Sequence, residues 1–173
     1  MRLALMLASV LAASPGAAGE CRAMLRPLLL ADAPDPAALA ATRAQCLMEA
    51  DAGDADALYQ LGLFHLGLAG VWQPDLARPM IQEAAAAGVP EAQYWLAWHF
   101  ESGDLLPQDT ALARDWYLRA ANANHRLALG RLADAHEKAE LGLARDPVAA
   151  ASYRARQARC TRPALDTAET GSN

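Results

Sequence analysis

The chain contains a repeat with a period of 35–36 residues, and this period restricts the possible folds more than any other feature. Residues 57–62 (ALYQLG) align with residues 92–97 (AQYWLA) at an offset of 35, and residues 76–78 align with residues 112–114 at an offset of 36. A third, weaker copy covers residues 128–133. Periods of this length are typical of solenoids in which pairs of helices stack on one another.

The composition also favours helices. Alanine supplies 43 of the 173 residues and leucine 27, and both are strong helix formers. Valine and isoleucine, the usual strand residues, are scarce, which argues against an all-β or α/β core. The net charge is −5, and no basic excess is present that would favour a nucleic-acid partner.

Residues that favour helix ends follow the same period. Carboxylates that can accept hydrogen bonds from free N–H groups precede four Ala-rich stretches: Asp35, Asp75, Asp109 and Asp146. Two prolines stand at first helical positions, Pro36 and Pro147. Residues that tolerate a left-handed conformation stand at the other ends: Gly53, Gly88 and Asn124. These positions predict one helical register throughout the chain.

The resulting prediction is an all-α solenoid. Its A helices are expected at about residues 56–67, 91–102 and 126–139, and its B helices at about 76–87, 110–123 and 147–159. These helices form three repeat units, 54–88, 89–124 and 125–159. An N-terminal helical hairpin at 20–53 caps them, and the polar tail at 160–173 is expected to be disordered.

Residues 1–19 have the pattern of a signal peptide. Arg2 precedes an uncharged stretch at 3–13, which is too short to cross a bilayer as a helix, so we expect no stable membrane insertion. Ala17 and Gly19 occupy the small-residue positions of a cleavage site. We therefore expect cleavage between Gly19 and Glu20, and a periplasmic or secreted mature protein.

The two central copies resemble the Sel-one-like repeat, a subfamily of tetratricopeptide-like repeats. The first copy matches at Ala57, Leu61, Gly62, Asp75, Ala84, Ala85 and Gly88. The second matches at Ala92, Leu96, Phe100, Gly103, Asp109, Trp116, Ala120 and Ala121. The third keeps Ala128, Leu132, Asp146, Ala150 and Tyr153, and His65 and His136 replace the Tyr that is usual in the family. The resemblance implies a right-handed α/α superhelix that acts as a bacterial adaptor or regulator without chemistry of its own.

The cysteines suggest one disulfide. Cys21 and Cys46 flank the predicted turn at residues 32–36, so an antiparallel hairpin would bring them level. Their bridge would stabilise the first layer of the solenoid, which has only one neighbour. Cys160 then remains unpaired. The alternative is that all three cysteines are buried free thiols.

Candidate catalytic and metal-binding motifs are weak, so we expect no enzyme activity, metal, cofactor or small-molecule substrate. His65 and His136 stand two repeats apart, and neither HExxH nor Cys-x-x-Cys occurs. A Gly-x-Ser-x-Gly motif is missing, and Ala135 stands three residues before Lys138, where a Ser-x-x-Lys dyad needs serine. Two alternatives remain. The first is a hydrolase of cell-wall or β-lactam substrates, since certain cysteine-rich members of the family have been labelled β-lactamases. The second is a structural subunit of the envelope.

The resemblance places the A helices on the concave face of the solenoid. With Leu61, Leu96 and Leu132 as core positions, the outward positions predict a groove for a protein or peptide: Tyr59, Leu63, Leu66, Tyr94, Trp98, Glu101, Asp134 and Glu137. Grouped aromatic and aliphatic side chains are typical of binding surfaces. The acidic end would favour a segment that carries Arg or Lys. Alternatively, Tyr94 and Trp98 fill gaps between the A helices.

Overall fold

The computed structural model describes residues 19–68 and 70–161, which form eight α-helices. In chain order they are α1 (Glu20–Leu29), α2 (Pro36–Asp51), α3 (Ala55–His65), α4 (Pro74–Ala86), α5 (Pro90–Ser102), α6 (Thr110–Asn122), α7 (Arg126–Lys138) and α8 (Pro147–Thr161). These residues form no β-sheet, although an isolated antiparallel bridge joins Leu66 to Trp72. Of the predicted leader at 1–19, residues 1–18 lie outside the described residues, and of the predicted disordered tail at 160–173, residues 162–173 do. Residues 160 and 161 belong to α8, so the prediction of disorder is wrong for these two.

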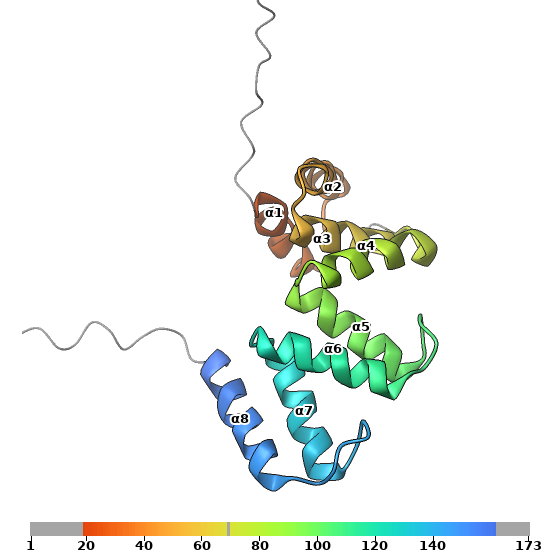
Figure 1. Cartoon of the computed structure of the whole chain (residues 1–173). Helices are drawn as coiled ribbons and strands as arrows, with labels where there is room; N and C mark the ends of the chain where they lie inside the picture. Colours follow the sequence, from red (N-terminus) through yellow and green to blue (C-terminus); the bar gives the residue numbers. More distant parts are fainter. Residues whose placement is uncertain (1–18, 69, 162–173) are drawn as a thin grey trace, which may run out of the picture.

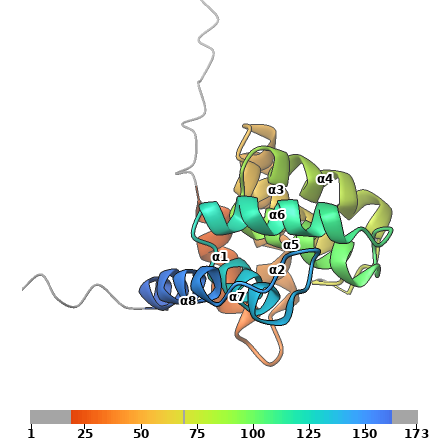
Figure 2. The ribbon, with the colours of Figure 1, turned by 60° about the horizontal axis from the view of Figure 1, so that its bottom comes forward.

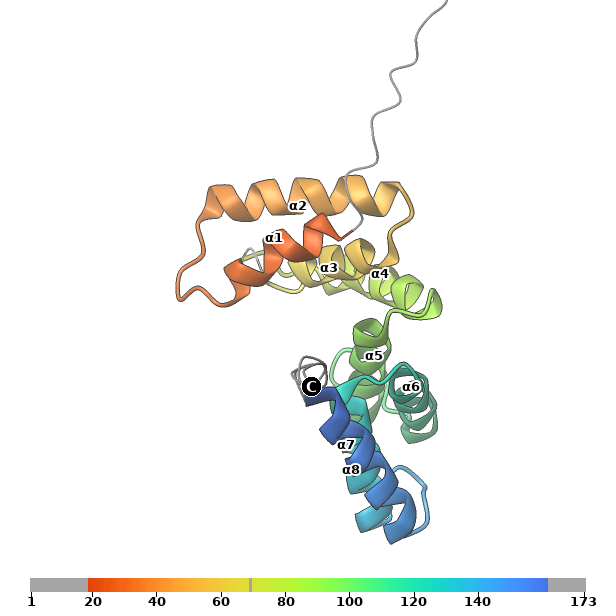
Figure 3. The same cartoon turned by 90° about the vertical axis from the view of Figure 1, so that its left-hand side faces the viewer.

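The helices pair in chain order and the pairs stack as a solenoid (Figure 1). Figure 3 shows α1 lying beside the longer α2 at one end of the stack and α7 beside α8 at the other, and in Figure 2 α8 again lies next to α7. The predicted all-α superhelix of antiparallel helix pairs is confirmed. Among the residues described, no helix combines the length and apolar character that crossing a membrane requires.

Most of the predicted helix ends are confirmed. Asp35, Asp109 and Asp146 each accept two hydrogen bonds from N–H groups of the first helical turn. Asp75 is a wrong prediction, because α4 begins one residue earlier, at Pro74, whose ring fixes a helical φ and lacks an N–H. Asp54, which the sequence reasoning missed, caps α3 through the N–H groups of residues 56 and 57.

The small residues of the repeat permit close helix packing. A Cβ atom at Gly62 in α3 would lie 2.5 Å from Cγ1 of Ile81 in α4, so glycine allows these two helices to approach. Gly130 in α7 faces the amide end of the Gln157 side chain in α8, which is flexible, so this contact requires glycine less strictly. The buried positions around these contacts are mostly alanine and leucine, as the repeat predicts.

The predicted disulfide between Cys21 and Cys46 is present and joins α1 to α2, with 4.7 Å between the Cα atoms. Both cysteines are fully buried. Cys160 is a free thiol and is exposed at the end of α8, so the alternative of three buried free thiols is wrong.

Candidate protein-binding surface

Equivalent positions of successive A helices form a row along the solenoid. Leu63, Trp98 and Asp134 occupy one such position in α3, α5 and α7, at offsets of 35 and 36 residues. Leu63 is half-buried, whereas the Trp98 side chain is 46% exposed. The row therefore presents an apolar side chain in the first repeat, an exposed indole in the second and a carboxylate in the third.

An open groove of about 370 Å³ begins this surface at the N-terminal end. It lies between α1, α3 and the start of α5, and its walls are Arg22, Leu25, Arg26, Leu29, Tyr59, Gln60, Leu63 and Glu91. Two of the predicted groove residues, Tyr59 and Leu63, are among them. Leu29 is 52% exposed, so the apolar part of the groove is open to a partner.

The charges in this groove are partly compensated. Arg22 forms ion pairs with Asp56, at 3.0 Å, and with Glu91. Burial raises the pKa of the Glu91 carboxyl, but the Arg22 guanidinium, a backbone hydrogen bond and His125 together lower it by more, so it stays ionised. Burial, with a smaller effect of Glu91 and Asp56, raises the pKa of Tyr59 to about 12, which keeps its hydroxyl a donor at neutral pH. Arg26 is exposed and forms no ion pair with a described residue.

Two of the predicted groove residues instead contribute to packing. Tyr94 is half-buried, and its ring centroid lies 5.7 Å from that of Tyr117 and 4.7 Å from that of His125. Leu66 follows the last residue of α3 and packs, partly buried, against the core around α4 and α5. The gap-filling interpretation therefore fits Tyr94, whereas nearly half of the Trp98 surface is accessible.

The three predicted acidic residues all pair with arginines of the solenoid itself. Glu101 pairs with Arg131 and accepts a hydrogen bond from the Tyr117 hydroxyl at 2.8 Å. Burial raises the pKa of Glu101, but these two partners lower it by more, so the carboxyl is ionised. Asp134 and Glu137 both contact Arg154 of α8. The negative charge of the acidic end is therefore partly neutralised within the chain.

Sequence reasoning missed the part of the groove that α1 contributes. Arg22, Arg26 and Leu29 follow one another at i, i+4 and i+7, a spacing that places them on one helix face. This spacing could have identified them. The predicted groove follows the A helices of the repeats, and residues 20–29 precede the first repeat.

The four histidines have different contacts and different structural roles. His65 contacts the side chain of Gln73, with 3.0 Å between Nδ1 and Oε1, and the His125 side chain caps α7. His136 stacks on Tyr153, and His99 packs against two tryptophans. Across residues 19–68 and 70–161, no cluster of three or more His, Cys, Asp or Glu side chains could hold a metal ion.

His99 is a buried base that forms no ion pair with another described residue. It is 4% exposed, its ring centroid lies 3.8 Å from Trp95 and 4.6 Å from Trp98, and its Nδ1 atom has no hydrogen-bond partner. Burial lowers the pKa of His99, and Asp104 opposes this only in part. The unfolded chain therefore binds more protons than the folded chain below about pH 6.5, and stability falls as the pH is lowered through this range.

Replacement of His99 by phenylalanine is expected to weaken this pH dependence. Phe64 occupies the equivalent position in the first repeat and is buried there, so the ring size suits the site. As the pH falls below about 6.5, His99 costs up to about 1.4 kcal/mol per pH unit, and His99→Phe should remove this contribution. Urea unfolding at pH 7 and pH 5 measures it. His65→Gln serves as control, and an unchanged slope in His99→Phe would contradict the prediction.

Comparison with known proteins places the chain in a family of helical repeats. The Sel1 repeat model matches residues 55–89 and 90–125, which correspond to α3–α4 and α5–α6. No curated protein sequence matches the chain. A crystal structure of a Sel1 repeat protein from Oxalobacter formigenes is 31% identical, with a TM-score of 0.63, and the match covers 68% of this chain and 88% of that one.

A second solved structure shares the fold. It is a protective antigen of uropathogenic Escherichia coli strains that displays an SLR fold, at 24% identity and a TM-score of 0.64. The match covers 83% of this chain but only 31% of the antigen, so this chain spans about a third of its length. Together with the two matched repeats and the Oxalobacter formigenes structure, the helix pairs described above show that the chain belongs to the Sel1 repeat family.

Proposed function

We propose that this protein is an exported adaptor without catalytic activity that binds a protein or peptide through the surface of its A helices. Sel1 repeats generally mediate protein–protein interactions. The observation that supports this surface is the apolar area left uncovered there. Leu29 and Trp98 are 52% and 46% exposed, and an open groove connects Leu29 to Leu63 and Tyr59. Exposed apolar and aromatic side chains with a polar rim are typical of interaction sites.

The charges of the surface indicate the chemistry of a partner. Arg26 stands at the groove without an ion pair among the described residues, so it can meet a carboxylate of the partner. Glu137, on the third A helix, is exposed and lies 3.5 Å from Arg154, and it remains able to contact a basic residue. We therefore propose a segment with an apolar residue for the leucines, an acidic residue for Arg26 and a basic residue farther along.

Substitution of the exposed apolar residues should abolish partner capture. The double variant Leu29→Asp with Trp98→Asp places carboxylates in the proposed surface, and both side chains are exposed, so the melting temperature should change little. The matched control is Leu76→Asp with Leu112→Asp. These residues are 49% and 43% exposed and occupy equivalent positions of the B helices α4 and α6.

Affinity capture from a periplasmic extract, read by mass spectrometry, compares the three proteins. Specific partners should be recovered by the wild type and the control but lost by the variant at Leu29 and Trp98. Equal recovery by both variants, at equal melting temperature, would place binding elsewhere and overturn the proposed surface.

Export is the second part of the proposal. The leader pattern at residues 1–19 supports it, and so does the disulfide, because structural disulfides persist mainly in oxidising compartments. In the mature protein the chain would begin at Glu20, the first residue of α1, so processing would end where the folded domain begins.

A further inference from the structure

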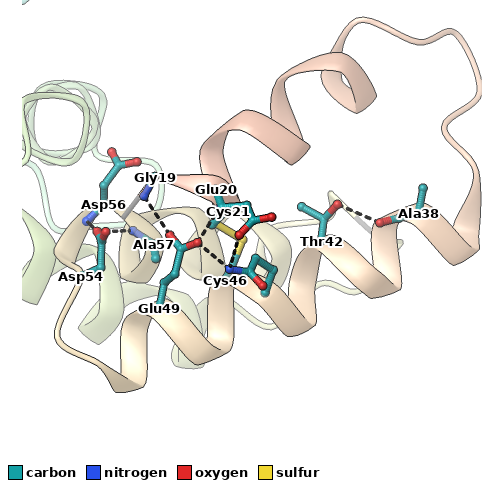
Figure 4. The surroundings of a disulfide bond; sticks show 11 residues. Gly19, Glu20, Cys21, Ala38, Thr42, Cys46, Glu49, Asp54, Asp56 and Ala57 are labelled. Carbon is teal, nitrogen blue, oxygen red and sulfur yellow. Dashed lines mark hydrogen bonds between the residues drawn. A yellow bond between two sulfur atoms is a disulfide. The ribbon is translucent and has the colours of Figure 1, made fainter. Parts of the chain in front are cut away.

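A buried carboxylate lies against the first turn of α1. Glu49 in α2 is 6% exposed and is one helical turn from the disulfide at Cys46. Its two oxygens accept hydrogen bonds from the backbone N–H of Gly19, at 3.2 Å, and of Cys21, at 2.9 Å (Figure 4). The side-chain amide of Gln45 donates a third bond at 2.8 Å.

All of these donors are neutral. Burial raises the pKa of Glu49, but the bonds from Gln45 and from the backbone of residues 19–21 lower it by more, so the carboxyl is ionised at neutral pH. Gln45 also donates to the carboxylate of Glu20, at 3.3 Å. Within the described residues, neither Glu20 nor Glu49 forms an ion pair with a basic side chain. Neutral hydrogen bonds alone therefore stabilise this buried anion, and an ion pair with a positive group would stabilise it further.

Other partly buried glutamates of the chain do form ion pairs with basic side chains. Glu91 pairs with Arg22, and Glu101 pairs with Arg131. Glu49 is more buried than either, yet its surroundings hold a second carboxylate and no positive charge. A positive group at the start of α1 would complete the same pattern there.

We propose that proteolytic processing supplies this positive charge, and that Glu49 is the binding site for the new α-ammonium group of the mature chain. The proposal rests on the export proposed above. Hydrolysis of the Gly19–Glu20 bond by water leaves a carboxylate on Gly19 and an ammonium group on the nitrogen of Glu20. That nitrogen lies in the chain between the two backbone donors that already bond to Glu49. A cut one residue earlier would place the ammonium on Gly19, 3.2 Å from Oε2 of Glu49.

Chemical acetylation tests this pairing directly. Lys138 is the only lysine of the sequence, so the processed chain 20–173 with Lys138→Arg has the α-amino group as its only amine. Only the unprotonated amine reacts, and an ion pair with Glu49 raises the pKa of the amine. With N-hydroxysuccinimidyl acetate at pH 7, Glu49→Gln should accelerate acetylation about tenfold, as one pKa unit implies. Asp51→Asn, which removes an exposed carboxylate of α2, should leave the rate unchanged.

Stability gives a second readout. In the chain with Glu49, acetylation should lower the ratio of folded to unfolded protein at pH 7 about tenfold or more, and in the Glu49→Gln variant it should not. The ammonium pKa is raised in the folded state, so this gain is present below the ordinary pKa of about 8 and is lost as the pH rises through the folded pKa. Each comparison sets an acetylated chain against the same chain unacetylated, so any loss of capping that Glu49→Gln itself causes cancels.

Equal acetylation rates in all three chains, or equal stability losses on acetylation of the parent chain and of its Glu49→Gln variant, would overturn the proposal. The mass of the protein recovered from the periplasm tests export independently. An unprocessed chain there would contradict the proposed export, whereas a chain that begins at Glu20 and shows no coupling to Glu49 would contradict only this inference.

Discussion

Replacement of Tyr117 by alanine is expected to lower the free energy of unfolding by about 3–5 kcal/mol, the range for removal of a fully buried aromatic side chain. Tyr117 in α6 is 1% exposed and packs among Ala97, Leu129 and Leu132 of the neighbouring A helices. Its loss leaves a cavity where α5, α6 and α7 meet, and alanines around it cannot expand to fill the space. Urea unfolding, monitored by circular dichroism, measures the change.

Tyr117→Phe separates ring packing from the hydrogen bond. The hydroxyl donates to Glu101, which also pairs with Arg131, so the phenylalanine variant loses a charge-assisted bond worth about 1.5–3 kcal/mol. The pKa of Tyr117 is raised by burial and by this carboxylate, so the hydroxyl keeps its proton at neutral pH. If Tyr117→Phe costs as much as Tyr117→Ala, the cavity is not the main contribution and the packing argument is wrong.

The fold could be predicted because its determinants repeat. Alanine and glycine at equivalent positions indicate where backbones approach, and Gly62 against Ile81 confirms this at one such contact. The C-terminal ends of helices could also be predicted from the sequence. Gly53 and Asn124, which were expected there, have the positive φ values that such ends require. Small residues and helix-ending residues that recur with the repeat period thus determine where the helices lie and how they pair.

The helix starts were predicted less completely, because two signals compete there. Asp75 and Asp54 are both acidic residues before an Ala-rich stretch, yet only Asp54 caps its helix. At the start of α4, Pro74 precedes Asp75 and already satisfies the geometry of the first helical position. When a proline stands directly before an acidic residue, the helix therefore begins at the proline, earlier in the chain. The carboxylate then lies in the first turn and does not cap the helix.

The binding surface could be predicted only in part, because long side chains reach across helices. The row that contains Leu63 and Trp98 follows from the repeat alone. The pairing of Glu101 with Arg131 and of Asp134 with Arg154 does not, since each joins two helices through flexible arginine stems whose direction no spacing specifies. The same holds for Glu49, whose partners are backbone groups of another helix.

Removal of the disulfide is expected to lower the free energy of unfolding by about 3 kcal/mol. In the double variant Cys21→Ser with Cys46→Ser, the unfolded chain regains the freedom that a bridge across 25 residues removes. The effect should concentrate in α1, because a ten-residue helix is marginal alone, and Cys21 and Leu25 are its only buried residues. Urea unfolding gives the total loss, and hydrogen exchange of the α1 amides shows where it arises.

Cys160→Ser is the matched control, since it removes an exposed free thiol outside the first layer and should leave stability within about 0.5 kcal/mol of the wild type. A non-reducing peptide map identifies the bridge itself. If it links Cys160 to either other cysteine, the hairpin geometry is wrong. If the map shows the Cys21–Cys46 bridge but its removal costs nothing, α1 is held by its contacts with α2 and α3 alone. In that case the N-terminal layer would have to be anchored by noncovalent contacts, among them the packing of the buried Leu25 and the hydrogen bonds to Glu49.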